Sequence, residues 1–486
     1  MSTLSEDIPF VARLNTAQAD QGASAGAESQ TSGQGFSLFQ RKDDSGDDGG
    51  AQKKQASNPF KGLFQKKDRA AEDKTETASR NGGLGLFGAG KSDADIAVQQ
   101  NAESVIISNL QVRRSIIPAG SSYDSVASAV LAANSRAAEA ELRAARLRAV
   151  AASKNWLPSI GPSISLSSLG ELVANLIVEQ VLFDNGRKKA ERAFAAADVE
   201  VAAVTLSQDT NMRVFTALDL YLKSQEATEK SRLSTTAFND MSHFEYIMTE
   251  RVRGGVSDRS DLVVLRQKLA EIRSDMASNS EASTTALAEL NAMSVRDLSG
   301  VSGLSDFNVN GLSSKPLPIL LAEAEKERAV AAATMERASN LPGLKAVGST
   351  GTSGNQVGLQ VASDQLFGFG TGATLKAIEA TKDGAQRKVG QAREDSDRRL
   401  RSLEAELRGV QRQSKEASAL SSQSKKNLDL FQAQYKAGTR QVMDVVGVYQ
   451  TYARQQSSAA TLKYRAARIK LEIAREMGLL ASGRDI

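Results

Sequence analysis

Residues 85–92, GLFGAGKS, match the phosphate-binding loop pattern G-x-x-x-x-G-K-[ST]. In a working loop, backbone N–H groups and Lys91 bind nucleotide phosphates, and the hydroxyl of Ser92 ligates magnesium. Such a loop needs a buried strand before it, but the preceding residues, AEDKTETASRNGGL, contain no run of Val, Ile or aromatic residues. Downstream, no apolar run ends in an aspartate that would supply a second magnesium ligand. We therefore predict that the chain binds no nucleotide.

The surrounding residues 1–95 are rich in Gly, Ser, Ala, Gln, Asp and Lys and show little periodicity. Such a segment cannot bury enough apolar surface to offset the entropy lost on ordering, so we predict that it is disordered. It repeats one short phrase, as SLFQRKD (37–43), GLFQKKD (62–68) and GLF (85–87), and the loop pattern arises from the glycine-rich end of the third copy. The phrases are either docking motifs or no more than apolar spots in a tail. Residues 1–20 lack the basic start and apolar core of a secretory signal.

The composition excludes several classes of site. The 61 basic and 57 acidic residues nearly balance, and no basic cluster alternates with aromatic residues, so nothing indicates a nucleic-acid binder. The absence of cysteine excludes disulfides, thiolate metal sites and a lipid-modified cysteine. The single histidine, His243, has the spacing of a helix-surface or packing residue. We predict no enzyme, no metal and no cofactor, and no apolar run reaches the 18 residues of a membrane helix.

The ordered part of the chain is dominated by long helices. Residues 122–154 have the composition of a helix, and residues 157–183 alternate apolar and polar side chains as two strands joined at Leu169-Gly170 would. Residues 188–253 favour helix throughout and would span about 100 Å. Gly254-Gly255 ends that helix, and Asp258 and Asp261 begin another that runs to about Asn291.

The same order of elements then recurs. Leu341-Pro342 follows Leu157-Pro158 by 184 residues, and Gly438 follows Gly255 by 183. A second hairpin is predicted over residues 341–367, turning at 351–354, and a second helical tip over 436–440. We infer a tandem duplication. The predicted organisation is a low-complexity segment (1–95), a linker (96–121), a first repeat (122–298, with its tip at 254–257), a connector (299–318) and a second repeat (319–486).

The pieces NWLPS…VEQVLFDNGRKKAE, RVRGGVSDRSDLVVLR and YKAGTRQVMDVVGVYQT resemble the TolC family of outer-membrane channel-tunnels, over residues 122–486. The resemblance implies a mainly α fold with a small β part. Long antiparallel helices would form an α-barrel, and the hairpins would contribute to a transmembrane β-barrel shared by a homotrimer. It also implies a passive exit duct in the outer membrane, in contact with lipid, for efflux of small molecules or type I protein secretion. Its partners would be a periplasmic adaptor and an inner-membrane pump.

The hairpins agree with this resemblance on physical grounds. Each block has 27 residues, which suffices for two strands of membrane-spanning length and a turn. Two hairpins cannot close a barrel alone, and open strand edges are not tolerated in lipid, so a spanning form must be an oligomer. Lys345 and Asp364 lie inside the second hairpin, however. The alternative is therefore a degenerate relative, a scaffold that keeps the helices and spans no membrane.

The resemblance also implies site residues at the two tips. The predicted adaptor-docking residues are Arg253, Gly254, Gly255, Val256, Ser257, Ala437, Gly438 and Thr439. The predicted gate pairs Tyr435 and Arg440 with Ser260 and Asp261, and Asp444 would form a carboxylate ring at the pore constriction. A second aspartate of the family is replaced by Gly447. The alternatives are that the glycines are simply good helix ends and that Asp261 and Asp444 simply stabilise helix N-termini.

Overall fold

The computed structural model describes residues 104–133, 137–166, 172–352, 354–363 and 368–483, all within the unit 85–486. The low-complexity segment, its GLFGAGKS motif, its Leu-Phe phrases, the turn at Leu169-Gly170 and Asp364 lie outside the described residues.

Within the described ranges the chain is mostly helical, as predicted. The helices are α2 (Val105–Gln111), α3 (Ser122–Ala132), α4 (Ala137–Ser153), α5 (Arg187–Arg253), α6 (Arg259–Ala292), α7 (Leu317–Ser339), α8 (Thr371–Lys436) and α9 (Val442–Glu476). The strands are β1 (Ser159–Leu166), β2 (Leu172–Phe183), β3 (Gly343–Gly351) and β4 (Gly354–Ala362). None of these helices is long and apolar enough to cross a membrane.

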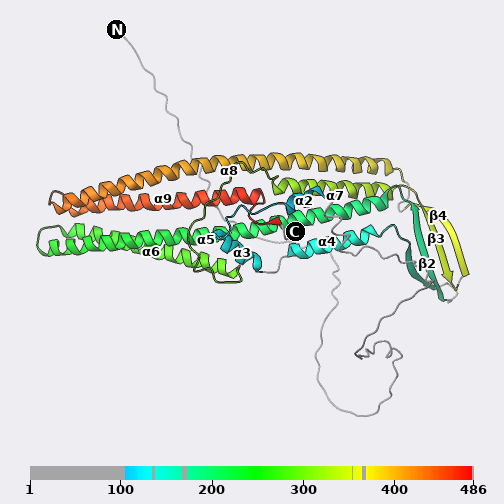
Figure 1. Cartoon of the computed structure of the whole chain (residues 1–486), viewed down its shortest axis with the longest axis horizontal. Coiled ribbons are helices and arrows are strands. Elements are labelled where there is room, and N and C mark those ends of the chain that lie inside the picture. The colour runs from blue at the N-terminus through cyan, green and yellow to red at the C-terminus, as the bar shows by residue number, and fades with distance from the viewer. Residues whose placement is uncertain (1–103, 134–136, 167–171, 353, 364–367, 484–486) are drawn as a thin grey trace, which may run out of the picture. The chain divides into compact units, whose positions relative to one another are not determined.

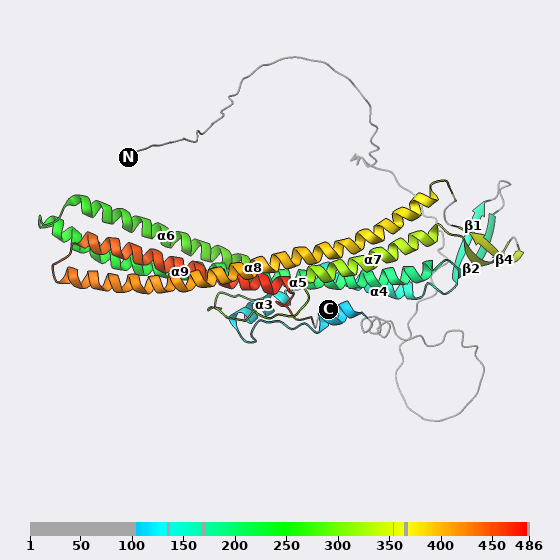
Figure 2. The ribbon, with the colours of Figure 1, turned by 90° about the horizontal axis from the view of Figure 1, so that it is seen from above.

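The helix α5 organises the unit, because it contacts almost every other helix along its 67 residues (Figure 1). Beside the sheet it lies between α4 and α7, and α7 also contacts α8. In the half away from the sheet it lies between α6 and α9, and α9 contacts α8 (Figure 2). The lateral order is therefore α4-α5-α7-α8 near the sheet and α6-α5-α9-α8 near the tips.

The long helices begin and end close to the predicted residues, whereas the first predicted helix differs. Residues 122–154 form two helices, because Ala133 leaves the helical conformation with ψ of 93°. The range 96–121, predicted as a linker, contains α2, whose Ile107 and Leu110 are buried. The long helices of the two predicted repeats, α5 and α8, have 67 and 66 residues. The duplication itself stays a prediction from the sequence.

The described strands form one antiparallel sheet of four strands in the order β1-β2-β3-β4. Successive pairs such as Ile160 with Val178, Val178 with Gly348, and Gly348 with Val357 define the register. Paired residues share a face and successive residues along a strand point to opposite faces, so this register decides which side chains lie together. The strands β1 and β4 are the two edges.

Three clusters of buried side chains hold the helices together. One surrounds the middle of α5 and includes Tyr123, Tyr221 and Leu471. A second, Ala-rich cluster lies between α5, α4 and α7 on the sheet side. The third joins the ends of α5, α6, α8 and α9 and includes Met241, Leu265 and Val445. The last cluster positions the tips, because it packs the two helical hairpins against each other.

Candidate functional site

The two tips end their helices with the same hydrogen-bonding pattern. At the first, the Val256 N–H donates to the Arg251 carbonyl at 2.8 Å and the Gly255 N–H to Val252 at 3.1 Å. At the second, the Thr439 N–H donates to Gln434 at 3.0 Å and the Gly438 N–H to Tyr435 at 2.9 Å. These are Schellman motifs, in which the residue after the cap takes a left-handed conformation.

Glycine is required at that position of both tips. The φ angles are +73° at Gly255 and +77° at Gly438, where a side chain is strained. The remaining predicted docking residues, Arg253, Gly254, Val256, Ala437 and Thr439, are exposed, and Ser257 is half-buried. Both tips are therefore glycine-capped helix ends, and their exposed residues also form an accessible surface.

The predicted gate residues of the second tip are anchored within their own hairpin and against α5. The Tyr435 ring meets the Phe244 ring edge to face, with centroids 6.4 Å apart. The Arg440 guanidinium lies 4.6 Å from the centre of the Phe431 ring and donates to Gln434 Oε1 at 3.1 Å.

The predicted partners on the first tip occupy the start of α6. Asp258 is the N-cap, and its carboxylate accepts from the Ser260 N–H at 3.0 Å. Asp261 lies in the first turn of that helix. In a single copy of the described chain, Arg440 bonds neither Ser260 nor Asp261. A single chain thus packs its two helical hairpins together near the tips without forming the predicted gate bonds.

Asp444 helps to cap the first turn of α9. It lies in the first turn of α9 and its carboxylate accepts from the Gln441 N–H at 3.3 Å. The side chain is nonetheless exposed, and so is Gly447 one turn later. The capping role is therefore observed, and a role at a pore constriction stays a prediction.

One hydrogen bond that joins the two helical hairpins was not predicted from the sequence. The Tyr449 hydroxyl on α9 donates to Asp240 Oδ2 on α5 at 2.6 Å, and the Tyr449 side chain is only 3% exposed. Burial, and then the neighbouring Asp240 carboxylate, raise the pKa of Tyr449 above its ordinary value, so the phenol stays protonated. The partners are 209 residues apart, so no local pattern signals this contact.

Further ion pairs join the same two helices towards the middle of the unit. Arg468 on α9 lies 2.7 Å from Glu226 and 3.2 Å from Asp219, both on α5. Glu229 accepts from Lys463 at 2.7 Å and from the Tyr464 hydroxyl at 2.9 Å. Burial opposes ionisation of Glu229, but these two hydrogen bonds hold its pKa below the usual range.

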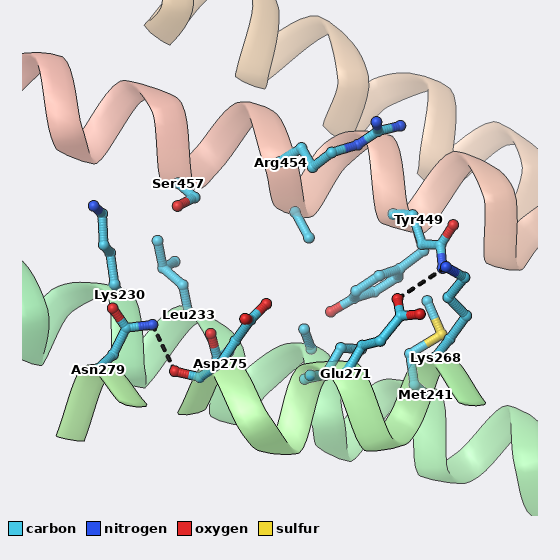
Figure 3. Close-up of a pocket in the computed structure, with 15 residues that line it drawn as sticks. Lys230, Leu233, Met241, Lys268, Glu271, Asp275, Asn279, Tyr449, Arg454 and Ser457 are labelled. Carbon is cyan, nitrogen blue, oxygen red and sulfur yellow. Dashed lines mark hydrogen bonds and ion pairs between the residues drawn. The ribbon is translucent and has the colours of Figure 1, made fainter. Parts of the chain in front are cut away.

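Between the Tyr449–Asp240 hydrogen bond and these ion pairs lies a groove of about 520 Å³, floored by α5 and flanked by α6 and α9 (Figure 3). Tyr449 lines one end and Lys230 lines another part of it. Its walls carry both charges, with Lys268 bonded to Glu271 at 2.8 Å. The groove lies where the two hairpins separate.

One face of the sheet is mainly apolar. It carries Ile160, Pro162, Ile164, Ala174, Leu176, Val178, Leu344, Ala346, Val357, Leu359 and Val361, together with the polar residues Gln180, Thr350 and Asn355. Nothing in the described part of the chain covers its β4 side, because Val357 and Leu359 are 92% and 71% exposed. An exposed apolar patch of this kind marks a protein–protein or membrane interaction site.

The opposite face holds the charged side chains and most of the polar ones. It carries Ser159, Ser163, Asn175, Glu179, Lys345, Ser349, Gln356 and Gln360, together with Val173, Ile177, Val181 and Val347. Lys345 bonds Glu179 at 2.8 Å on this face. The lysine that favoured a non-spanning relative therefore does not interrupt the apolar face.

Across the described ranges, no group of three or more His, Asp or Glu side chains lies close enough to hold a metal ion. His243 is exposed on α5, with its ring 6.3 Å from that of Phe244.

No protein-family model matches the chain, and no curated protein matches it. Several solved structures, however, match it in fold. A membrane protein from Pseudomonas aeruginosa superposes with a TM-score of 0.65 at 16% identity, covering 76% of this chain and 92% of that one. The Campylobacter jejuni CmeC outer membrane channel gives 0.62 at 14% identity, covering 74% and 86%. The outer membrane protein VceC from Vibrio cholerae gives 0.63 at 15% identity, covering 73% and 96%.

The chain has the fold of a TolC-like outer-membrane channel. The resemblance drawn from the sequence is confirmed at this level, as is the mainly α fold class with its small β part. In the TolC-like fold of this chain, the amphipathic sheet and the two glycine-capped tips lie at opposite ends of α5 (Figure 1).

Proposed function

We propose that three copies of the chain assemble into an outer-membrane channel, in which the sheets close a β-barrel and the helices line a periplasmic tunnel. The observation that carries the proposal is the four-stranded sheet, with one exposed and mainly apolar face, a second face that holds the charged side chains, and two unpaired edges. Unpaired strand edges are excluded from lipid, so the sheet spans a membrane only when further copies close it.

The length of the longest strand fits this role. The 12 residues of β2 extend about 40 Å when measured along the strand. At the tilt of about 45° usual in membrane barrels this becomes about 28 Å, close to the hydrocarbon thickness of about 30 Å. The apolar face then meets lipid, and the face with Lys345 and Glu179 meets the water-filled interior.

The positions of the edges support a closed ring. α4 leads into the edge strand β1, and the edge strand β4 leads towards α8. α4 and α6 are also the outermost helices on one side and α8 on the other. One copy therefore offers β4 and α8 to the β1, α4 and α6 of the next, a head-to-tail contact that closes into a ring. Two copies would give an eight-stranded barrel, whose interior side chains fill. The number three follows from the family resemblance.

The function that fits this assembly is a passive exit duct rather than an enzyme. An inner-membrane pump would supply the energy, and a periplasmic adaptor would dock on the exposed tip residues around Gly255 and Gly438. The gate pairs of Arg440 and Tyr435 with Asp261 and Ser260 would then form between neighbouring copies. The exposed carboxylate of Asp444 would lie near the narrow end, where three copies favour cations.

The absence of cysteine permits a direct test of the sheet's orientation. We would introduce Leu359→Cys on the apolar face or Gln360→Cys on the polar face, and treat the reconstituted protein with a membrane-impermeant maleimide. The proposal expects Gln360→Cys to react and Leu359→Cys to stay unreactive, because only the former faces water. Equal reactivity of both cysteines would favour the non-spanning scaffold.

A further inference from the structure

The helix side of the sheet carries a concentration of positive charge. The basic collar consists of Arg187, Lys188, Lys189 and Arg192 at the start of α5, and Lys376 near the start of α8. Residues 184–192 and 371–376 contain these five basic residues and only two acidic ones, Asp184 and Glu191. Both helices begin beside the sheet (Figure 1). The collar is therefore continuous with the sheet end.

The two acidic residues are already engaged. Asp184 accepts from the backbone N–H groups of Gly186 at 3.1 Å and Lys188 at 2.6 Å. Glu191 lies 3.2 Å from the Arg187 Nε and 3.7 Å from the Lys188 Nζ. Excess positive charge therefore remains in the collar.

Three collar residues have no acidic partner within the described ranges. Arg192 donates only to the neutral Asn155 Oδ1, at 2.7 Å. Lys189 and Lys376 are exposed and belong to no ion pair of the described residues. The stability of α5 does not explain the cluster either, because cations in the first turn oppose the helix dipole and that turn holds no acidic residue.

The depth of the collar matches that of lipid headgroups. The apolar face ends near Phe183, which is 58% exposed, and Trp156, whose carbonyl accepts from the Gln180 side chain on β2, is 63% exposed. Exposed aromatic side chains at the end of an apolar band mark the membrane–water boundary. Arg187 to Arg192 span about 8 Å beyond the strand. The headgroup layer on each side of a bilayer is about 5–8 Å thick.

We propose that the basic collar binds the phosphate groups of anionic phospholipids in the leaflet that faces the helices. The inference rests on the proposed function, because it requires the apolar face to lie in the membrane. The collar then orients the barrel by charge, in addition to the apolar face. Each basic residue near an anionic surface strengthens lipid association about fivefold, and salt weakens it.

Trp156 reports this association directly, since it is the single tryptophan and lies beside the sheet end. Full-length protein is reconstituted in phosphatidylcholine vesicles that contain either brominated phosphatidylglycerol or brominated phosphatidylcholine. Quenching of Trp156 by each lipid gives the ratio of their association constants. We expect phosphatidylglycerol to be preferred about fivefold or more. The preference should decline at high salt.

The variant Lys189→Gln with Lys376→Gln should bring the ratio close to one. The matched control, Lys415→Gln with Lys426→Gln, removes two exposed lysines from α8 at a distance from the sheet and should leave the ratio unchanged. Two results would overturn the lipid-binding inference and leave the proposed function standing. They are equal quenching by both lipids in the wild type, and an unchanged ratio in the variant Lys189→Gln with Lys376→Gln. No quenching by either lipid would overturn the proposed membrane position of the sheet as well.

Discussion

The hydrogen bond from Tyr449 to Asp240 should hold the two helical hairpins of one copy together. Of the side-chain hydrogen bonds and ion pairs that join α5 to α9 in the described residues, it lies nearest the tips, and it is short at 2.6 Å. Tyr449→Phe removes the hydroxyl and keeps the ring, which also packs edge to face on Tyr452 with centroids 6.2 Å apart. The substitution therefore tests the hydrogen bond rather than the packing.

The expected loss is about 1.5 kcal/mol. A hydrogen bond to a charged acceptor contributes about 1.5–3 kcal/mol. The low end applies because Asp240 is exposed, so water can solvate its carboxylate once the phenol is gone. A change of about 1.4 kcal/mol is a factor of ten in an equilibrium constant, so the local separation of α9 from α5 should become about tenfold more frequent.

Hydrogen exchange followed by mass spectrometry measures that separation in peptides that cover residues 236–248 and 442–456. Tyr452→Phe is the matched control, because its hydroxyl bonds Gln456 on the same helix and joins nothing across the groove. We expect about tenfold faster exchange in Tyr449→Phe than in Tyr452→Phe. Equal exchange in the two variants would show that packing alone holds α9 to α5.

Three further outcomes follow from the tips and the central ion pairs. Gly255→Val should cost more than about 1 kcal/mol of tip stability in hydrogen exchange, because φ is +73° there, whereas Gly254→Ala, at φ of −77°, should be tolerated. Glu229 has a pKa below its unfolded value, so its contribution is present above the ordinary value of 4.5 and is lost as pH falls below it; denaturant unfolding of the wild type and Glu229→Gln should converge in acid. Asp444→Ala should cost about 0.5 kcal/mol of helix stability, because it removes the carboxylate that accepts from the Gln441 N–H at the positive end of α9, and it should also lower cation selectivity in bilayers if three carboxylates face the pore.

The sequence was most informative where a single residue type decides the local backbone. Gly254-Gly255 predicted the end of α5 at Arg253, because a left-handed residue is needed there and glycine supplies it. The strand alternation from Leu172 to Val178 likewise predicted a two-faced hairpin. Where no strong breaker stands in the chain, as at Ala133, the helix boundary was missed.

Contacts between distant segments were beyond sequence reasoning. Nothing near Asp240 or Tyr449 shows that they meet, because the contact depends on how two helical hairpins pack. The side of the sheet on which Lys345 lies follows only from its register with Val181 and Gln360. In a single chain Arg440 bonds Gln434 and not Asp261, so the gate stays a prediction, and under the proposed assembly its pairs would form between neighbouring copies.

Single-channel recording in planar lipid bilayers tests the central proposal most directly, that copies of this chain close a membrane-spanning channel. The wild type should give discrete conductance steps. Leu359→Lys places a charge on the lipid-facing side and costs about 2–4 kcal/mol of insertion near the midplane, so it should abolish the steps. Gln360→Lys, one residue along on the polar face, should keep them and shift the ion selectivity towards anions. No steps from the wild type, or equal loss in both variants, would contradict the proposed channel.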